Sequence, residues 1–130
     1  MKWHEQALLL LEKAGEDEYA LNRLLDDPNV SEAVLGFHAQ QAVEKALKAV
    51  LAEKRIEFHR THDLTLLLDL VNTHGIAYPP EWEKITELTP FAAELRYGNF
   101  PSDESAEASL DRKWVGEIVS QVIGWAKALT

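Results

Sequence analysis

The sequence contains no cysteine, which excludes disulfides and metal sites built on thiolates. It also lacks a glycine-rich phosphate loop and a Gly-x-Ser-x-Gly motif, so two common catalytic signatures are missing. No apolar run approaches the length of a membrane span, and the first six residues do not resemble a secretory signal. We therefore expect a soluble cytoplasmic protein that does not associate with membranes.

Positive charge is scarce too, with 13 basic against 22 acidic residues and a formal net charge of −9. This balance disfavours tight, sequence-independent binding to a phosphate backbone, which depends on clustered lysine and arginine. A local basic pocket is still compatible with it, and the densest basic patch comprises Lys45, Lys48, Lys54, Arg55 and Arg60. The length of 130 residues predicts one domain, 1–130, with a single core.

Residues 34–51 predict a long helix at the centre of a helical bundle. A stripe at helical spacing would let another helix approach closely, and it consists of Leu35, Ala39, Ala42, Ala46 and Ala49. A bulkier apolar surface beside it consists of Val30, Val34, Phe37, Leu47 and Leu51. Between them runs a polar ridge of His38, Gln41, Lys45 and Lys48. Two interpretations stay open for this ridge: a solvated face with a Glu44–Lys48 pair, or a binding site.

The same periodicity predicts helices on both sides of the central one. The first helix covers residues 3–25, and either Asn29 or Ser31 caps the central helix, which runs to about residue 54. The third helix begins at position 62 or 63, is capped by Thr61 and runs to about residue 72, where Gly75 stops it.

A fourth helix opens at Glu81, is interrupted by Pro90, and resumes its helical spacing over residues 91–97. The last helix is capped by Ser102 or Asp103 and runs to about residue 129. There is no alternating strand pattern, internal repeat or long linker. The sequence therefore predicts an all-α fold, an up-and-down helical bundle of about five helices.

Two further groups of residues have the composition of a site. His59 and His62 are three residues apart with Asp63 adjacent, which would suit two metal ligands on one helix. The pair spans a loop and a helix start, and no third ligand is evident, so we expect neither a metal nor another cofactor. Arg96 and Tyr97 end the fourth helical segment, where the arginine has acidic residues nearby to pair with.

Three segments of the sequence carry a family resemblance, namely FHAQQAVEKALKA at 37–49, THDL at 61–64 and LRY at 95–97, of which the first is the most specific. Taken together, they resemble the higher eukaryotes and prokaryotes nucleotide-binding (HEPN) domain family. The resemblance covers about residues 3–129. It implies an all-α bundle that forms a homodimer and a gene paired with that of a minimal nucleotidyltransferase, in a toxin–antitoxin-like module.

The resemblance also implies a candidate activity, because many HEPN proteins are metal-independent ribonucleases with an arginine followed four to six residues later by a histidine. Arg96 matches that arginine, but no histidine follows His74. We therefore expect no enzymatic activity and a cleft that binds a nucleotide, RNA or the partner protein. The alternatives are a ribonuclease toxin with His38 as a relocated histidine, and a structural adaptor without a ligand. The expected binding residues are His38, Gln41, Lys45, Lys48, His62, Asp63, Arg96 and Tyr97.

Overall fold

The computed structural model describes residues 2–92 and 110–130. Within these ranges every regular element is a helix: α1 (Lys2–Leu24), α2 (Glu32–Glu53), α3 (Leu64–Thr73), the 3-10 helix η1 (Pro80–Leu88) and α6 (Arg112–Leu129). The predicted all-α bundle of about five helices is confirmed. None of the described helices combines the length and the apolar character that a membrane span requires.

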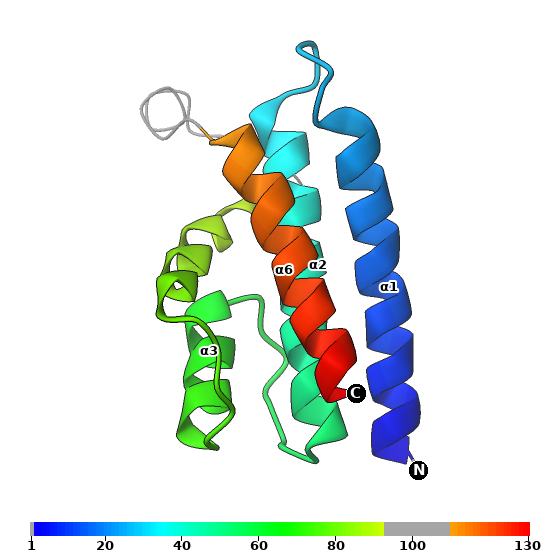
Figure 1. Ribbon diagram of the computed structural model, residues 1–130, viewed down its shortest axis with the longest axis vertical. Coiled ribbons are helices and arrows are strands. Elements are labelled where there is room, and N and C mark those ends of the chain that lie inside the picture. Colours follow the sequence, from blue (N-terminus) through cyan, green and yellow to red (C-terminus); the bar gives the residue numbers. More distant parts are fainter. Residues whose placement is uncertain (1, 93–109) are drawn as a thin grey trace.

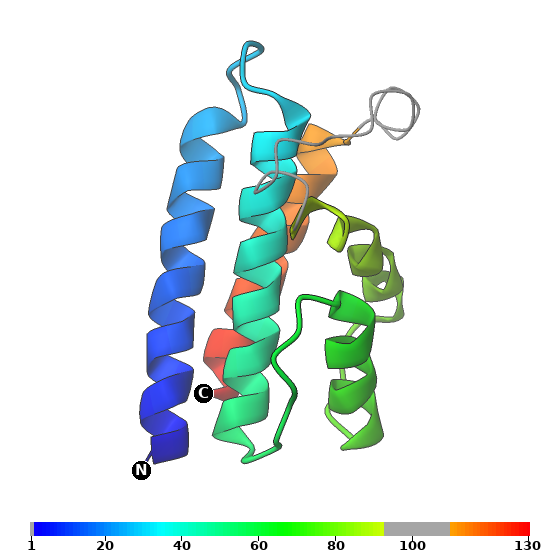
Figure 2. The same cartoon turned by 180° about the vertical axis from the view of Figure 1, so that it is seen from behind.

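Helix α2 is the centre of the bundle, as the sequence predicted, because it contacts each of the other described helices. α1 and α2 form a long antiparallel hairpin, and α6 packs against both and runs antiparallel to α1 (Figure 1). α3 and η1 lie on the other side of α2 from α1, with η1 above α3 in both views (Figures 1 and 2). The connector of residues 54–63 returns along α2 before α3 begins (Figure 2).

The small-residue stripe of α2 is completely buried. α1 meets this hairpin interface with Ala7, Ala14 and Leu21, which recur every seven residues and are themselves fully buried. Because most of these side chains are alanine, the two helices can pack closely along their length. This close packing is what brings polar side chains of α1 and α2 within bonding distance of one another.

The N-terminal caps differ in part from the sequence predictions. Ser31, predicted as the alternative cap, is the cap of α2, with its hydroxyl accepting from the amide of Val34 at 3.3 Å, so the prediction of Asn29 is wrong. Asp63 caps α3, which begins at residue 64, so the prediction of Thr61 as cap is also wrong. A carboxylate beside the exposed amides of a helix start has the charge that the helix dipole favours, and Thr61 instead accepts from the Asp63 amide.

Two helices are followed by a residue in the left-handed backbone conformation. Gly75 follows α3 with φ of 76°, as the sequence predicted, and Arg55 follows α2 with φ of 60°. In both cases the next amide, from Ile76 or Ile56, bonds to the carbonyl five residues back, at 3.1 and 2.8 Å. This hydrogen-bonding pattern normally uses glycine, since a side chain disfavours positive φ.

The predicted fourth helix is present, but it is a 3-10 helix rather than an α-helix, and it starts at Pro80, one residue before Glu81. Its apolar residues explain the difference, because Trp82, Ile85 and Leu88 are spaced by three and all three are buried. A 3-10 helix repeats every three residues and so places all three on one face, against the rest of the core.

The last described helix begins later than predicted. Asp111 caps α6 and accepts from the amide of Trp114 at 3.1 Å, while Leu110 and Asp111 are themselves outside the helix. One continuous helix from position 102 or 103 is therefore wrong, because a capping residue interrupts it. The predicted caps Ser102 and Asp103 lie outside the described residues.

Arg112, the first residue of α6, holds the turn between α1 and α2. Its guanidinium donates to the carbonyls of Leu25, Asp27 and Val30 at 2.9, 2.9 and 2.8 Å. Carbonyls at the end of a helix and in a turn have no helical partner, so these bonds satisfy groups that would otherwise need water. These bonds attach the start of α6 to the turn of the α1–α2 hairpin.

Candidate functional site

The polar ridge of α2 lies against α1, where a carboxylate neutralises part of it. Asp17 of α1 places Oδ1 3.1 Å from Nδ1 of His38 and Oδ2 2.6 Å from Nζ of Lys45. The Asp17 side chain is 13% exposed and that of Lys45 is 26% exposed, so water screens this ion pair only in part. We refer to Asp17, His38 and Lys45 as the Asp17 cluster.

A second carboxylate pairs with Lys48, the last residue of the ridge. Glu44 accepts from Nζ of Lys48 at 2.8 Å, the spacing that the sequence predicted for a pair. Its other oxygen accepts from Nε2 of Gln40 at 2.8 Å and lies 2.9 Å from Nδ1 of His62. Glu44 is only 4% exposed, so three polar groups surround a buried charge. We refer to Gln40, Glu44, Lys48 and His62 as the Glu44 cluster.

Amide groups extend the Glu44 cluster to the connector and along the ridge. Gln41 donates to the Gln40 side-chain oxygen at 2.7 Å, and Gln40 donates a second time, to the backbone carbonyl of His62 at 3.1 Å. Gln40 is fully buried, and each side-chain group it carries has a partner. Hydrogen-bonded amides of this kind fix the orientation of the carboxylate beside them.

Glu44 is charged at neutral pH in spite of its burial. Burial raises the pKa of this carboxyl, but hydrogen bonds from Lys48, Gln40 and His62 and the charge of Lys48 lower it by more, so the pKa lies below its ordinary value. Each of the two lysines of the ridge is therefore balanced by a carboxylate. The ridge carries no excess positive charge for a phosphate.

The Asp17 cluster contains one arrangement that is also found in catalytic sites, an imidazole oriented by a carboxylate. A carboxylate against Nδ1 holds an imidazole in a fixed orientation and leaves Nε2 as the reactive nitrogen, as in many general bases. His38 is 25% exposed, and its ring also packs edge-on against Phe37, with 5.5 Å between centroids. Lys45 shares the same carboxylate, so a cation lies next to the oriented imidazole.

The structure brings together five of the predicted binding residues and separates a sixth. His38, Gln41, Lys45, Lys48 and His62 all belong to the two clusters or contact them. Asp63 instead caps α3 by accepting from the Thr65 amide at 2.9 Å, so its position is explained by helix structure. Arg96 and Tyr97 lie outside the described residues.

Gln40 and Asp17 were missed from the sequence, and Glu44 was predicted only as the partner of Lys48 on a solvated face; a signal for burial existed for Gln40 and Glu44. Gln40 and Glu44 fill the gap between Phe37 and Leu47 in the bulky apolar stripe, at spacings of three and four. Polar residues on an otherwise apolar helix face must find partners when that face is buried. Asp17 had no such signal, because its role depends on how α1 lies against α2.

The connector histidines do not form a metal site with their neighbours. Within residues 2–92 and 110–130, no group of three histidine, aspartate or glutamate side chains has a geometry that could hold a metal ion. His62 directs Nδ1 at Glu44, while Asp63 is engaged at the start of α3. The described clusters are therefore best understood as hydrogen-bonded ion pairs.

Comparison with protein families decides which class of protein carries this site. The family model of the HEPN domain matches residues 7–127, a range that includes parts of all the described helices. The chain belongs to the HEPN domain family. The Gln40, Glu44 and Lys48 of this HEPN domain lie within the α2 segment that carried the sequence resemblance, and the resemblance is confirmed. Comparison with curated proteins and with solved structures gives no significant match.

Proposed function

We propose that this HEPN-domain protein is a binding subunit without catalytic activity, and that its partner is a minimal nucleotidyltransferase in a toxin–antitoxin-like module. The observation that supports a protein partner best is the charge balance on α2. Lys45 and Lys48 each lie within 2.8 Å of a carboxylate oxygen. The net charge of −9 adds to the effect, because it repels phosphate backbones at long range.

Nucleotide or RNA binding is disfavoured by the same contacts. A phosphate that approached Lys45 would have to displace Asp17, whose carboxylate is attached to a packed helix and would stay next to the ligand. Breaking a partly buried ion pair leaves a charge without its partner, which is costly. A protein partner can instead use the exposed parts of the chain and leave both clusters intact.

The outer side of α1 offers apolar side chains for such a partner. Leu8 and Leu9 are 49% and 55% exposed, and Tyr19 is 67% exposed. Leu8 and Tyr19 are eleven residues apart and therefore lie on the same side of the helix, with Leu9 beside them. Leucine and tyrosine side chains that lose contact with water on association contribute favourable free energy.

The first test is the gene neighbourhood, where we expect an adjacent gene for a minimal nucleotidyltransferase. The second test is to mix the purified product of that gene with this protein and to measure association by calorimetry. We expect a complex, and we expect that the double variant Leu8→Glu, Leu9→Glu fails to form it. Leu66→Glu is the matched control, because Leu66 is also 49% exposed but lies on α3. Absence of a complex with the wild-type protein would contradict the proposal and favour a structural adaptor.

The proposal includes an isologous two-fold homodimer, which the family resemblance implies. A dimer with such an axis would carry two α1 helices, one in each protomer, and hence two copies of the proposed partner surface. Sedimentation at micromolar concentration is the measurement, and we expect the mass of a dimer. A monomer throughout the concentration range would contradict this part of the proposal.

A metal-independent ribonuclease is the second candidate, because His38 is oriented by Asp17 and lies beside Lys45. We expect no cleavage of RNA above background at neutral pH, with or without a chelator. If RNA is cleaved, His38→Ala decides the origin of the activity, and His4→Ala is its control. His4 also contacts a carboxylate, Glu53 at 2.7 Å, but stands outside both clusters. Cleavage lost only in His38→Ala would overturn the non-catalytic proposal.

A further inference from the structure

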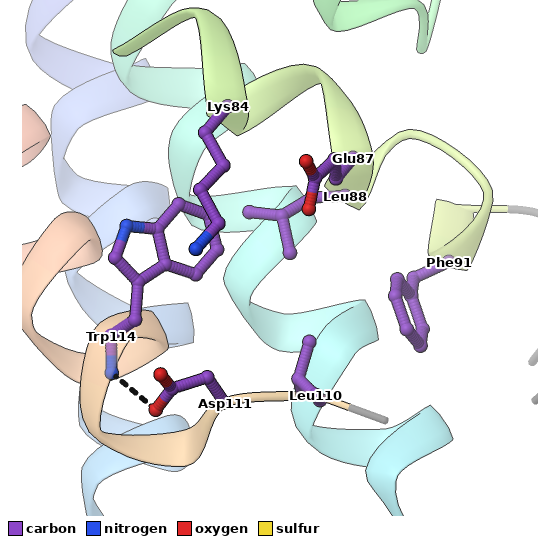
Figure 3. A pocket seen from close by; sticks show the side chains of 7 residues that line it. All are labelled: Lys84, Glu87, Leu88, Phe91, Leu110, Asp111 and Trp114. Atoms are coloured by element: carbon purple, nitrogen blue, oxygen red, sulfur yellow. Dashed lines mark hydrogen bonds between the residues drawn. The ribbon is translucent and has the colours of Figure 1, made fainter. Parts of the chain in front are cut away.

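A cavity of about 400 Å³ lies between η1 and the start of α6, and none of the residues that line it belongs to the two clusters on α2. Its volume is within the range of small-ligand sites, roughly 300 to 1,000 Å³. Figure 3 shows the side chains around it, which are Lys84, Glu87, Leu88, Phe91, Leu110, Asp111 and Trp114. The nature of these side chains indicates what the cavity would bind.

One wall of the cavity is an aromatic face that already carries a cation. Nζ of Lys84 lies 4.6 Å from the centroid of the Trp114 ring, and Figure 3 shows the lysine extended over the indole. The electron-rich face of an indole attracts ammonium and guanidinium groups more strongly than other aromatic side chains do. The chain itself therefore supplies a cation to this position.

Two carboxylates face the same cavity, one from η1 and one from the residue that caps α6. Glu87 comes from η1 and makes no ion pair with any described residue. Asp111 uses Oδ1 to accept from the Trp114 amide, and its other oxygen points toward the cavity (Figure 3). Together with the ammonium of Lys84, the lining has one net negative charge. A cation is therefore favoured over an anion at this site.

The rest of the lining is apolar. Leu88 and Phe91 are buried at 1% and 8% exposure, and Leu110 closes the side toward α6. Such a lining suits the methylene groups of a ligand whose charged end lies on the indole, in the way that lysine and arginine stems lie on apolar surfaces. A ligand with a cationic head and an apolar stem satisfies both parts of the cavity.

We infer that this cavity binds an organic cation, namely a guanidinium or alkylammonium group on an apolar stem, with Lys84 holding the position on Trp114 that the ligand's cation takes. The ligand's charge would lie between the carboxylates of Glu87 and Asp111, and its stem would contact Leu88 and Leu110. The inference does not depend on the proposed partner protein, because it uses different residues.

The test is calorimetric titration with arginine amide, and with citrulline amide as a neutral probe of nearly the same shape. We expect arginine amide to bind about two- to thirty-fold more tightly, the range that a cation–π contact provides. Lys84→Gln should tighten this binding, because it removes the internal competitor. Glu87→Gln should weaken it, while Glu81→Gln, an exposed change on the same 3-10 helix outside the cavity lining, should leave it unchanged.

Several outcomes would overturn the inference. They are equal binding of both amides, weaker binding by Lys84→Gln, and tighter binding of adenosine monophosphate than of arginine amide. Trp114→Leu should abolish the preference for the cation, and if circular dichroism shows that this variant is unfolded, Glu87→Gln decides. A peptide with a single arginine separates the two sources of the same chemistry: tighter binding than arginine amide indicates a protein side chain, and equal binding indicates a free cation.

Discussion

Oδ2 of Asp17 lies 2.6 Å from Nζ of Lys45, and this contact joins the two long helices of the hairpin at the point where the polar ridge crosses their interface. The same carboxylate also reaches His38. One side chain of α1 therefore places a carboxylate beside two residues of α2. Viewed on α2 alone, the ridge is basic, whereas in the folded protein it is balanced.

Asp17→Asn tests this balance. An amide keeps the shape but removes the charge, so we expect a loss of about 2 kcal/mol in the free energy of unfolding. We also expect the variant to gain measurable binding to short RNAs, because Lys45 loses its carboxylate. Urea titration and fluorescence anisotropy are the measurements. Glu12→Gln, an exposed acid of the same helix, is the control and should show neither effect.

Glu44 predicts a specific dependence of stability on pH. Its pKa in the folded protein is below the ordinary value of 4.5, so the unfolded chain binds this proton first as the pH falls. The stability that Glu44 contributes is therefore complete above about pH 4.5 and is lost as the pH falls through the folded pKa. Glu44→Gln should lose about 3 kcal/mol at pH 7, and the difference from wild type should shrink in acid. A constant difference between the two unfolding free energies from pH 7 to pH 3 would contradict this assignment.

Arg55 and Gly75 form a matched pair for a test of backbone strain, because both end a helix with positive φ. The left-handed conformation costs a non-glycine residue about 1–2 kcal/mol, which glycine avoids. Glycine in turn makes the unfolded chain more flexible, which lowers stability by about 0.4–1 kcal/mol. Arg55→Gly should therefore stabilise the protein by roughly 0.5 to 1 kcal/mol. Gly75→Ala should destabilise it by a similar amount. Thermal unfolding of both variants is the check, and shifts of the same sign would show that φ does not control these positions.

Gly36 and Gly124 form a second pair, in which only the surroundings differ. A Cβ atom at Gly36 would overlap the ring of Phe91, whereas one at Gly124 would meet nothing within 4 Å. Gly36→Ala should cost about 1–3 kcal/mol by overpacking. Gly124→Ala should gain about 0.5–1 kcal/mol, because alanine favours the helix. Equal effects of the two substitutions in a thermal melt would contradict the close packing of α2 on Phe91.

The helices were predictable because their apolar residues repeat every three or four positions. Residues 34–51 showed two interior surfaces, and the structure does place α2 in contact with every other described helix. The 3-10 form of η1 was not foreseen, because a spacing of three over so few residues also fits an α-helix. Trp82, Ile85 and Leu88 reveal it only when their common burial is known.

The sequence predicted which residues of α2 form the polar ridge, but it did not predict that carboxylates balance their positive charge. His38, Lys45 and Lys48 were chosen because they lie on one face of a helix, which spacing alone establishes. Their partners come from two different sources. Glu44 is four residues from Lys48 and could be found locally, whereas Asp17 is 28 residues from Lys45 and depends on the register between two helices.

The contact of Arg112 with the turn between α1 and α2 has a consequence for synthesis of the protein. The hairpin is translated first, but the carbonyls of its turn receive their guanidinium only after residue 112 has left the ribosome. α2 likewise packs against α6, which is the last helix to be translated. A nascent hairpin would thus expose apolar surface throughout most of elongation, which is the condition in which chaperones bind. Ribosome-bound chains that stop before residue 112 should accordingly be more sensitive to protease in the 25–31 turn than chains in which α6 has emerged.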